Sequence, residues 1–249
     1  MDTGLQGKTA LVTGSHRGTG QIIADLLAAE GSNVIYHGLQ AEDYEKLQTE
    51  RPGVLAVCGD ITTEAGTAET VNQVMALTGG VDVLVNNYGT ADAGKWQTST
   101  TEDWITSYQK NTLSVVRLIQ AFTPGMTSRG WGRIVNLGTV GSTKPNARSP
   151  QYYAAKGALA NLTVGLAKEL SGTGITVNLV SPGMIRTAEV EEAYLTRARA
   201  QGWGDTFEEA EAQIVRAWAP NPLGRMATRE EVAQVVVFLS SQAASFVNA

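Results

Sequence analysis

The sequence predicts an α/β fold in which a single, mostly parallel sheet is covered by helices on both faces. Short apolar runs alternate with longer helical patterns from the N-terminus to about residue 180, and this alternation is typical of βαβ units. Several runs are apolar throughout, as expected for strands buried on both faces of a doubly wound sheet. The 249 residues allow one large domain or two small ones, and we expect a single domain over residues 1–249.

The candidate strands are the apolar runs at residues 9–13, 33–37, 54–58, 81–87, 133–138 and 175–181. A helix is expected to begin near Thr101, where Thr-Glu-Asp supplies a capping residue and first-turn carboxylates. Another is expected over residues 152–170, where apolar residues recur at three and four, namely Ala155, Leu159, Leu162, Leu166 and Leu170. Residues 186–222 have helical patterns between Pro-Gly and Pro-Asn-Pro, and we interpret them as a substrate-loop insertion over the active site.

Composition excludes several classes of function. The 19 Lys and Arg residues against 24 Asp and Glu give a net charge of −5 without a dense basic run, so nucleic acid is not an expected partner. The start MDTGLQGK lacks a signal pattern, and no later segment approaches the roughly 18 apolar residues of a membrane span. A single cysteine, Cys58, excludes an internal disulfide. We expect a soluble, cytoplasmic protein, and we assign no metal ligands.

A glycine-rich turn directly follows the first candidate strand. It reads Thr13-Gly14-Ser15-His16-Arg17-Gly18-Thr19-Gly20 and leads into the helical pattern QIIADLLAAEG. Glycines let the backbone approach a pyrophosphate, while helix N–H groups and the helix dipole point at it. The spacing differs from the G-x-G-x-x-G fingerprint, and glycines after a strand also occur in simple tight turns.

The end of the second candidate strand bears on the choice between NAD(H) and NADP(H). An acid there would bind the adenosine ribose 2′-hydroxyl and repel a 2′-phosphate, but the chain reads Tyr36-His37-Gly38-Leu39. Arg17 and His37 are candidates to face a 2′-phosphate, although Arg17 could equally be solvated or paired with a surface carboxylate. We expect NADP(H) to be preferred over NAD(H), and Gly38→Asp to shift that preference towards NADH.

Tyr152 and Lys156 are four residues apart on the helix expected at 152–170, which places both side chains on one face. A tyrosine is a poor base at neutral pH because its pKa is near 10. A neighbouring ammonium and an oxidised nicotinamide would both favour the phenolate, so proton transfer becomes feasible near pH 7. The pair alone is a weak signal, because this spacing often occurs by chance.

Together these motifs resemble the short-chain dehydrogenase/reductase family over essentially the whole chain, closest in look to its 3-oxoacyl-acyl-carrier-protein reductases. The resemblance implies a Rossmann-type fold and an oxidoreductase that moves a hydride between nicotinamide and a ketone or secondary alcohol. It assigns catalytic roles to Asn111, Thr139, Tyr152 and Lys156. It assigns cofactor contacts to Gly14, Ser15, His16, Arg17, Gly18, Gly20, His37, Asp60, Ile61, Asn87, Gly89, Tyr152, Lys156, Pro182, Gly183, Ile185 and Thr187.

Two positions depart from the family pattern. Thr139 stands where the family has its catalytic serine, and its hydroxyl can still orient a carbonyl although the methyl narrows the pocket. Ser142, three residues on, is an alternative, and either hydroxyl could simply cap the loop. Tyr88 stands where the family has alanine, so its ring either fills a local gap or shapes substrate access.

The resemblance implies further properties. Asn111 would interrupt its helix and hold a water that links Lys156 to solvent. The chain would form a homotetramer. The family usually continues into a final strand and a glycine-containing tail, so the end at Ala249 raises the prospect of a truncated sequence and puts the last sheet edge in doubt.

Substrate identity is left open, because one fold serves many substrates. A 3-oxoacyl thioester is our first expectation, and basic residues near the cleft mouth would favour it, with Arg129, Arg133, Arg148 and Arg186 as candidates. A secondary-alcohol, hydroxysteroid or sugar dehydrogenase is the alternative, with Tyr88, Trp96, Trp203 and Trp218 as candidates for an apolar pocket or for ordinary packing. A third, different class is a dinucleotide-binding regulator without catalysis.

Overall fold

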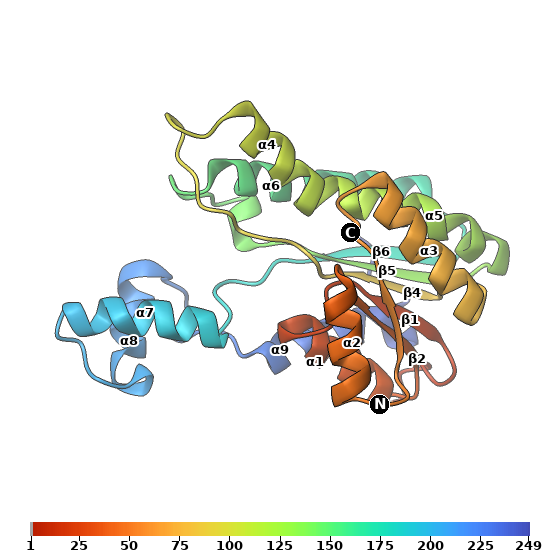
Figure 1. Cartoon of the computed structure of the whole chain (residues 1–249), viewed down its shortest axis with the longest axis horizontal. Coiled ribbons are helices and arrows are strands. Elements are labelled where there is room, and N and C mark those ends of the chain that lie inside the picture. The colour runs from red at the N-terminus through yellow and green to blue at the C-terminus, as the bar shows by residue number, and fades with distance from the viewer. Residues whose placement is uncertain (1) are drawn as a thin grey trace.

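The structure, a computed structural model, describes residues 2–249 and contains one six-stranded parallel sheet (Figure 1). The strands are β1 Thr9–Val12, β2 Asn33–Gly38, β3 Leu55–Cys58, β4 Val83–Asn86, β5 Gly132–Leu137 and β6 Ile175–Val180. They lie in the order β3-β2-β1-β4-β5-β6. The predicted single-domain, doubly wound α/β fold is confirmed, and the predicted strand ends differ from the observed ones by at most two residues.

Helices cover both faces of the sheet (Figure 1). They are α1 Gly18–Ala29, α2 Ala41–Glu50, α3 Glu64–Thr78, α4 Thr101–Tyr108, α5 Ser114–Arg129, α6 Pro150–Glu169, α7 Ala188–Ala200, α8 Phe207–Trp218 and α9 Arg229–Ser240. Helices α1 and α9 pack together on one face, and α3, α5 and α6 cover the other. Helices therefore bury both faces of the sheet, which explains why several strands are apolar throughout.

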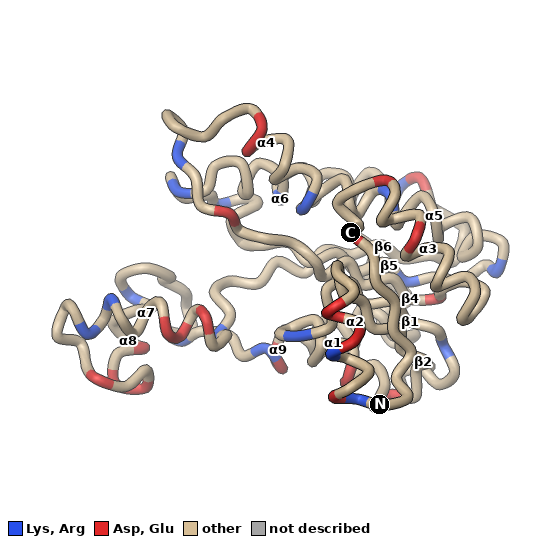
Figure 2. The backbone as a smooth tube through the Cα atoms, in the orientation of Figure 1, with Lys and Arg blue, Asp and Glu red and all other residues tan. Residues whose placement is uncertain are grey.

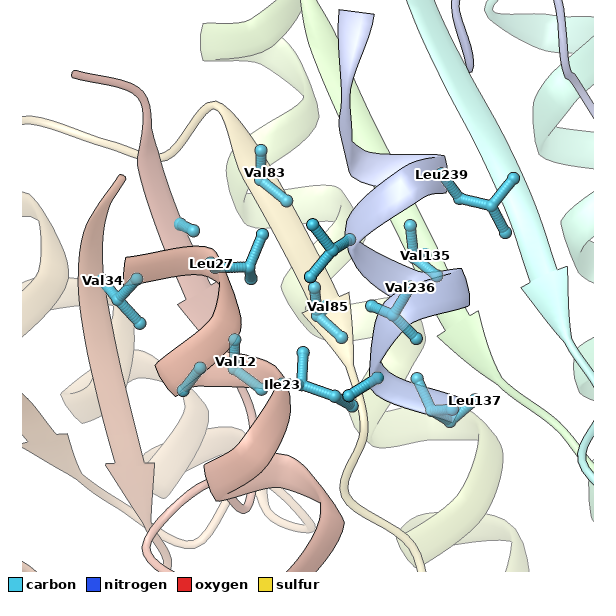
Figure 3. Packing of buried hydrophobic residues seen from close by; sticks show 14 of the residues in the cluster. Val12, Ile23, Leu27, Val34, Val83, Val85, Val135, Leu137, Val236 and Leu239 are labelled. Atoms are coloured by element: carbon cyan, nitrogen blue, oxygen red, sulfur yellow. The ribbon is translucent and has the colours of Figure 1, made fainter. Parts of the chain in front are cut away.

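Alternate residues of each strand supply the two cores. On β1, Ala10 and Val12 pack in the core beside α1 and α9, and Leu11 packs in the opposite core. On β4, Val83 and Val85 lie beside α1 and α9, as the labelled side chains of Figure 3 show. This two-residue period is the geometry of a strand, and it places apolar side chains in both layers at once.

The strand order reverses between β1 and β4, which lie side by side in the middle of the sheet. The chain builds outward from β1 through β2 to β3, and then returns to place β4 against the other side of β1. Loops that leave the carboxyl ends of β1 and β4 diverge at such a point and leave a crevice, where ligands bind in open α/β sheets. The predicted glycine-rich turn follows β1 and Asn87 follows β4, so both lie at this crevice.

Helices α7 and α8 form a small lobe with its own apolar core, and the lobe projects from the body of the molecule (Figure 1). Phe207, Ile214 and Met226 are buried within it. A parallel bridge between Ile185 and Ala227 closes the base of the lobe. No helix within residues 2–249 is long and apolar enough to span a membrane.

The last residues run beside β6, the edge strand. The Ala249 N–H donates to the Val177 carbonyl at 3.0 Å, and the Val177 N–H donates to Asn248 Oδ1 at 2.8 Å. Part of the hydrogen-bonding potential of this edge is thereby satisfied.

The two cores predict where truncation of a side chain is costly. Leu118 on α5 is fully buried between the helix and the sheet, so Leu118→Ala should lower the free energy of unfolding by about 2–5 kcal/mol through lost burial and a residual cavity. Met75→Ala on α3 is a suitable control because Met75 is 48% exposed, and it should change stability by less than about 0.5 kcal/mol. Urea unfolding at one fixed protein concentration measures both. Equal losses in the two variants would contradict this account of the core.

Candidate active site

Helix α6 carries Tyr152 and Lys156 one turn apart, as the spacing predicts. The helix starts abruptly, because Ser149 adopts the left-handed region with φ 51° and Pro150 takes the first helical position. The Ser149 N–H donates to the Gly94 carbonyl at 3.1 Å. The loop after β4 therefore fixes the end of α6 that bears Tyr152.

The hydroxyl that reaches Tyr152 belongs to Thr139, directly after β5. Its hydroxyl lies near enough to the Tyr152 phenol to favour the phenolate, and it accepts from the Gly141 N–H at 3.2 Å. Ser142 is turned away, since its hydroxyl donates to the Lys156 carbonyl at 3.1 Å. Of the two candidate hydroxyls, the structure brings only Thr139 to the tyrosine.

Lys156 and Asn111 meet beside Gly89. A Cβ at Gly89 would lie 3.0 Å from Lys156 Nζ and 2.7 Å from Asn111 Oδ1, so both polar groups use the space that a side chain would fill. Asn111 lies in a wide helical turn, Gln109–Leu113, that links α4 to α5. Its amide accepts from the Thr90 N–H at 3.1 Å and donates to the Thr90 carbonyl at 3.0 Å. The predicted interruption of the helix at Asn111 is present, and it ties the helix to the loop after β4.

Burial controls the protonation of both catalytic candidates. Burial raises the pKa of Tyr152 to about 12, and the nearby Thr139 hydroxyl offsets only part of that rise. Burial lowers the pKa of Lys156 to about 8, and its Nζ donates to the Leu137 carbonyl at 2.7 Å. The sequence predicted that Lys156 would pull the tyrosine pKa down, but in the structure the net shift is upward because desolvation of the phenolate dominates. At neutral pH Tyr152 is a protonated phenol.

The turn after β1 fits a pyrophosphate. Gly14 and Gly18 have φ of 61° and 64°, where other residues are strained, and a Cβ at Gly20 would lie 2.6 Å from the Gly14 carbonyl oxygen. Within the described residues, α1 has neither a side-chain cap from Arg17 nor an acid in its first turn. Its first N–H groups are thus left for an anion. Ser15 has a structural part in the turn, because its hydroxyl donates to the Val12 carbonyl at 2.7 Å.

The prediction that His37 faces a 2′-phosphate is wrong. The imidazole is fully buried, and its Nδ1 accepts from the Gly14 N–H at 3.1 Å while its Nε2 lies 3.1 Å from the Gly59 carbonyl oxygen. These partners require the neutral tautomer with hydrogen on Nε2, and burial lowers the pKa of His37 to about 4. His37 therefore holds the glycine-rich turn from below and is not available to a ligand.

An acid does stand at the end of β2, although the sequence analysis found none. Asp43, in the first turn of α2, fills the space beside Gly38, and a Cβ at Gly38 would lie 2.3 Å from the Asp43 Cβ. Its Oδ2 accepts from the Leu39 and Gln40 N–H groups at 2.9 and 3.1 Å. The expected effect of Gly38→Asp is withdrawn, because that side chain would collide with Asp43. The sequence feature that could have indicated Asp43 is its place as an acid at the third position of α2.

The other predicted cofactor residues line the same crevice edge. Arg17 is exposed and lies 3.7 Å from Glu189, the pairing that the sequence analysis left open. His16 Nε2 lies 3.5 Å from Asp43 Oδ1. Asn87 donates to the Thr13 carbonyl at 2.9 Å, and Tyr88 packs against Gly14 with its ring partly buried, as expected of a gap-filling role.

Asp60 and Ile61 follow β3. The Asp60 carboxylate accepts from the Thr62 N–H at 3.0 Å, and Ile61 is buried. After β6, the Pro182 carbonyl accepts from the Val140 N–H at 3.0 Å, so the Pro182-Gly183 stretch lies against the loop of Thr139. Ile185 forms the bridge to Ala227, and Thr187 caps α7 by accepting from the Val190 N–H at 3.3 Å.

The arginines offered as a basic rim do not gather at the cleft: Arg129, Arg133, Arg148 and Arg186 lie apart. Arg129 pairs with Asp82, just before β4, and Arg133 is buried at the start of β5. Both arginines thus lie at the amino ends of the strands, whereas Tyr152 lies at the carboxyl ends. Arg186 is held by two glutamates of the lobe. Arg148 alone of the four is exposed near the start of α6.

The aromatic candidates also lie apart. The Trp203 and Trp218 rings are 4.8 Å apart in the α7–α8 lobe, where Tyr194 joins them. Trp96 is 70% exposed and stacks on Trp104. Packing within the lobe thus accounts for Trp203 and Trp218, whereas Trp96 stays largely exposed in the loop after β4.

The sequence matches the family model described as short chain dehydrogenase over residues 8–198. The chain belongs to the short-chain dehydrogenase family. It is 36% identical over 247 residues to a 3-oxoacyl-[acyl-carrier-protein] reductase of Pseudomonas aeruginosa, covering 98% of this chain and 94% of that one. It is 34% identical over 244 residues to D-beta-hydroxybutyrate dehydrogenase of Cupriavidus necator, covering 96% and 93%.

A solved structure of a short-chain dehydrogenase agrees with this assignment. L-sorbose reductase from Gluconobacter frateurii, complexed with NADPH and L-sorbose, has a TM-score of 0.90 and 30% identity over 100% of this chain and 95% of that one. The chain is therefore an oxidoreductase that acts on carbonyl or alcohol groups with a nicotinamide dinucleotide.

The burial of His37 predicts acid sensitivity of the glycine-rich turn. Its folded pKa of about 4 lies below the unfolded value of 6.5, so between these values the unfolded state binds more protons and stability falls as the pH falls. From pH 6.5 to 4, the wild type should lose up to about 3 kcal/mol more unfolding free energy than His37→Gln.

Urea unfolding at several pH values measures this difference. His16→Gln serves as a control. His16 is only partly buried, so this substitution should reduce the pH dependence of the unfolding free energy less than His37→Gln does. Parallel curves for wild type and His37→Gln would refute the assignment of a buried, neutral imidazole.

Proposed function

We propose that the enzyme reduces the 3-oxo group of acyl substrates, with Tyr152 as proton donor and Thr139 as the hydroxyl that orients the carbonyl. The contact between Thr139 and the protonated Tyr152 carries this proposal. Two relatives support the substrate class, because one is named for 3-oxoacyl chains and the other for β-hydroxybutyrate, so both names describe oxygen at the third carbon. The dispersed arginines give no support to a dedicated carrier-protein surface at the cleft.

Reduction is the proposed direction, and the protonation of the site supports it. The glycine-rich turn and Lys156 would hold a nicotinamide dinucleotide, which would supply the hydride for the carbonyl carbon. Tyr152, neutral at pH 7 because burial raises its pKa to about 12, gives its proton to the carbonyl oxygen, and the product is a secondary alcohol. Thr139 donates to the same oxygen as negative charge develops on it. A protonated phenol is ready for reduction, whereas oxidation of the alcohol would first require its proton to leave.

We further propose that Lys156 binds the nicotinamide ribose and that Asn111 places a water beside it to return a proton to Tyr152. Lys156 is buried, so a water or ribose hydroxyl is the partner that its amine can reach besides the Leu137 carbonyl. The Lys156 amine and the Asn111 amide oxygen both lie beside Gly89, which supports a link between the two residues through one water. The α7–α8 lobe covers the substrate side of the cleft in this proposal.

NADP(H) is the proposed preferred cofactor. The exposed Arg17 guanidinium lies in the glycine-rich turn with only a long ion pair to Glu189, so it is available to a 2′-phosphate. L-sorbose reductase holds NADPH, and a 3-oxoacyl reductase of Agrobacterium tumefaciens, with a TM-score of 0.85, holds NADP.

A ketose reductase is the second candidate, favoured by the likeness to L-sorbose reductase. Steady-state assays with acetoacetyl thioesters, acetoacetate and L-sorbose, each with NADPH and NADH, distinguish the two. Highest kcat/KM on the 3-oxoacyl compounds is the expected result. Highest kcat/KM on L-sorbose would replace the proposal with the second candidate, and cofactor binding without any turnover would indicate a non-catalytic regulator.

The contact of Thr139 predicts a specific mutational pattern. Thr139→Val keeps the shape but removes the donor, so kcat should fall by about 10²-fold or more, as for other oxyanion donors. Thr139→Ser should remain active, and Tyr152→Phe should be at least as damaging as Thr139→Val. Ser142→Ala is the control, since that hydroxyl serves the Lys156 carbonyl. Loss of turnover in Ser142→Ala with intact Thr139→Val would assign the catalytic hydroxyl to Ser142.

We propose a cytoplasmic homotetramer. An apolar groove runs between α5 and α6, and its lining includes Ile119, Leu162, Leu166 and Leu170, which favours burial against a second subunit. Light scattering should give about four times the 26.4 kDa of one chain. A mass of one chain at micromolar concentration would overturn the tetramer without affecting the proposed chemistry.

A further inference from the structure

The carboxylate of Asp43 is held rigidly at the crevice edge. Its Oδ2 accepts from the Leu39 and Gln40 N–H groups at 2.9 and 3.1 Å, which fixes the plane of the carboxylate. Its other oxygen, Oδ1, lies 3.5 Å from His16 Nε2. Because His16 belongs to the turn after β1 and Gly38 ends β2, this oxygen lies between the two segments that flank the adenosine ribose in dinucleotide-binding sheets.

Gly38 allows this arrangement. A Cβ at Gly38 would lie 2.3 Å from the Asp43 Cβ and 3.2 Å from its carboxylate carbon, so the acid occupies the volume that a side chain at the strand end would take. The usual carboxylate at this position enters from β2. In this chain a carboxylate enters the same place from α2, five residues later.

The negative charge of Asp43 is not cancelled by a full positive charge from His16. Burial lowers the pKa of His16 below its ordinary 6.5, so the imidazole is mainly neutral at pH 7. The nearby cations have other carboxylate partners: Arg17 lies 3.7 Å from Glu189, and Lys46 lies 3.7 Å from Glu50. The Asp43 side chain is 27% exposed, and Figure 2 shows that acidic positions dominate the first half of α2.

We propose that Asp43 is a second specificity-determining residue for the cofactor, which accepts a hydrogen bond from the adenosine ribose 2′-hydroxyl and repels a 2′-phosphate. It opposes Arg17, so the enzyme uses NAD(H) alongside NADP(H), and the balance of the two side chains sets the ratio. This inference rests on the proposed use of a nicotinamide dinucleotide with its adenosine end at this edge, but not on the identity of the carbonyl substrate.

Asp43→Asn tests the inference, because the amide oxygen can keep the bonds from Leu39 and Gln40 while the charge is lost. The probes are adenosine 2′,5′-bisphosphate and adenosine 5′-monophosphate, whose affinities are measured by calorimetry. The affinity ratio of bisphosphate to monophosphate should rise roughly tenfold, as expected for removal of one repulsive charge at a partly exposed site. The ratio of kcat/KM for NADPH over NADH should rise in parallel.

Glu42→Gln is the matched control, since Glu42 is the exposed neighbour in the same helical turn. It removes the same charge and should change the affinity ratio by less than about twofold because of solvent screening. Equal changes in Asp43→Asn and Glu42→Gln, or no change in either, would overturn the inference. A shifted affinity ratio in an enzyme that reduces no carbonyl would leave the inference standing and refute the proposed function.

If Asp43→Asn fails to fold, Arg17→Gln provides the test in the opposite direction. With Arg17 removed, Asp43 alone faces the 2′-phosphate, so Arg17→Gln should bind the bisphosphate more weakly than the monophosphate. Binding of the bisphosphate by Arg17→Gln as tight as or tighter than that of the monophosphate would show that Asp43 does not repel the 2′-phosphate and would overturn the inference.

Discussion

The hydrogen bonds of Thr13 join the two halves of the site. Its N–H donates to the Val85 carbonyl at 3.0 Å, its hydroxyl accepts from the Tyr88 N–H at 2.9 Å, and its carbonyl accepts from Asn87 at 2.9 Å. Thr13 is buried, so these bonds are shielded from competition with water. They fix the glycine-rich turn against the loop that continues to Gly89, Asn111 and Lys156. The spacing between the glycine-rich turn and the loop that reaches Lys156 is set by these bonds together with the pairing of β1 and β4.

Local sequence patterns predicted most of the fold and the order of the motifs. Strand burial on both faces produces continuous apolar runs, and the spacing of Tyr152 and Lys156 is a property of a single helix. What the patterns could not give was the direction of side chains that pack across elements. His37 at the end of β2 points under the turn after β1, and Asp43 on α2 reaches back over Gly38. Both side-chain directions depend on how α2 is placed against β1 and β2. A short stretch of sequence does not specify that placement.

The same limit applies to the catalytic hydroxyl and to the tyrosine pKa. The sequence favoured Thr139 over Ser142, and the structure separates the two side chains, because the Ser142 hydroxyl donates to the Lys156 carbonyl while Thr139 lies beside Tyr152. Proximity of Lys156 suggested a lowered pKa for Tyr152, yet burial, which disfavours the phenolate, raises that pKa to about 12. Burial is a property of the whole fold, so the sign of a shift that depends on burial cannot be read from two residues and their spacing.

The α7–α8 lobe has a core of its own and joins the sheet through a narrow base, where Arg186 and Ala227 exchange backbone contacts. Substitutions inside that core leave the packing around β1 and β4 untouched, because within residues 2–249 the lobe shares no buried apolar cluster with the sheet. With the lobe over the substrate side of the cleft, as proposed, its side chains can be changed to suit another carbonyl substrate while the dinucleotide-binding half keeps its packing.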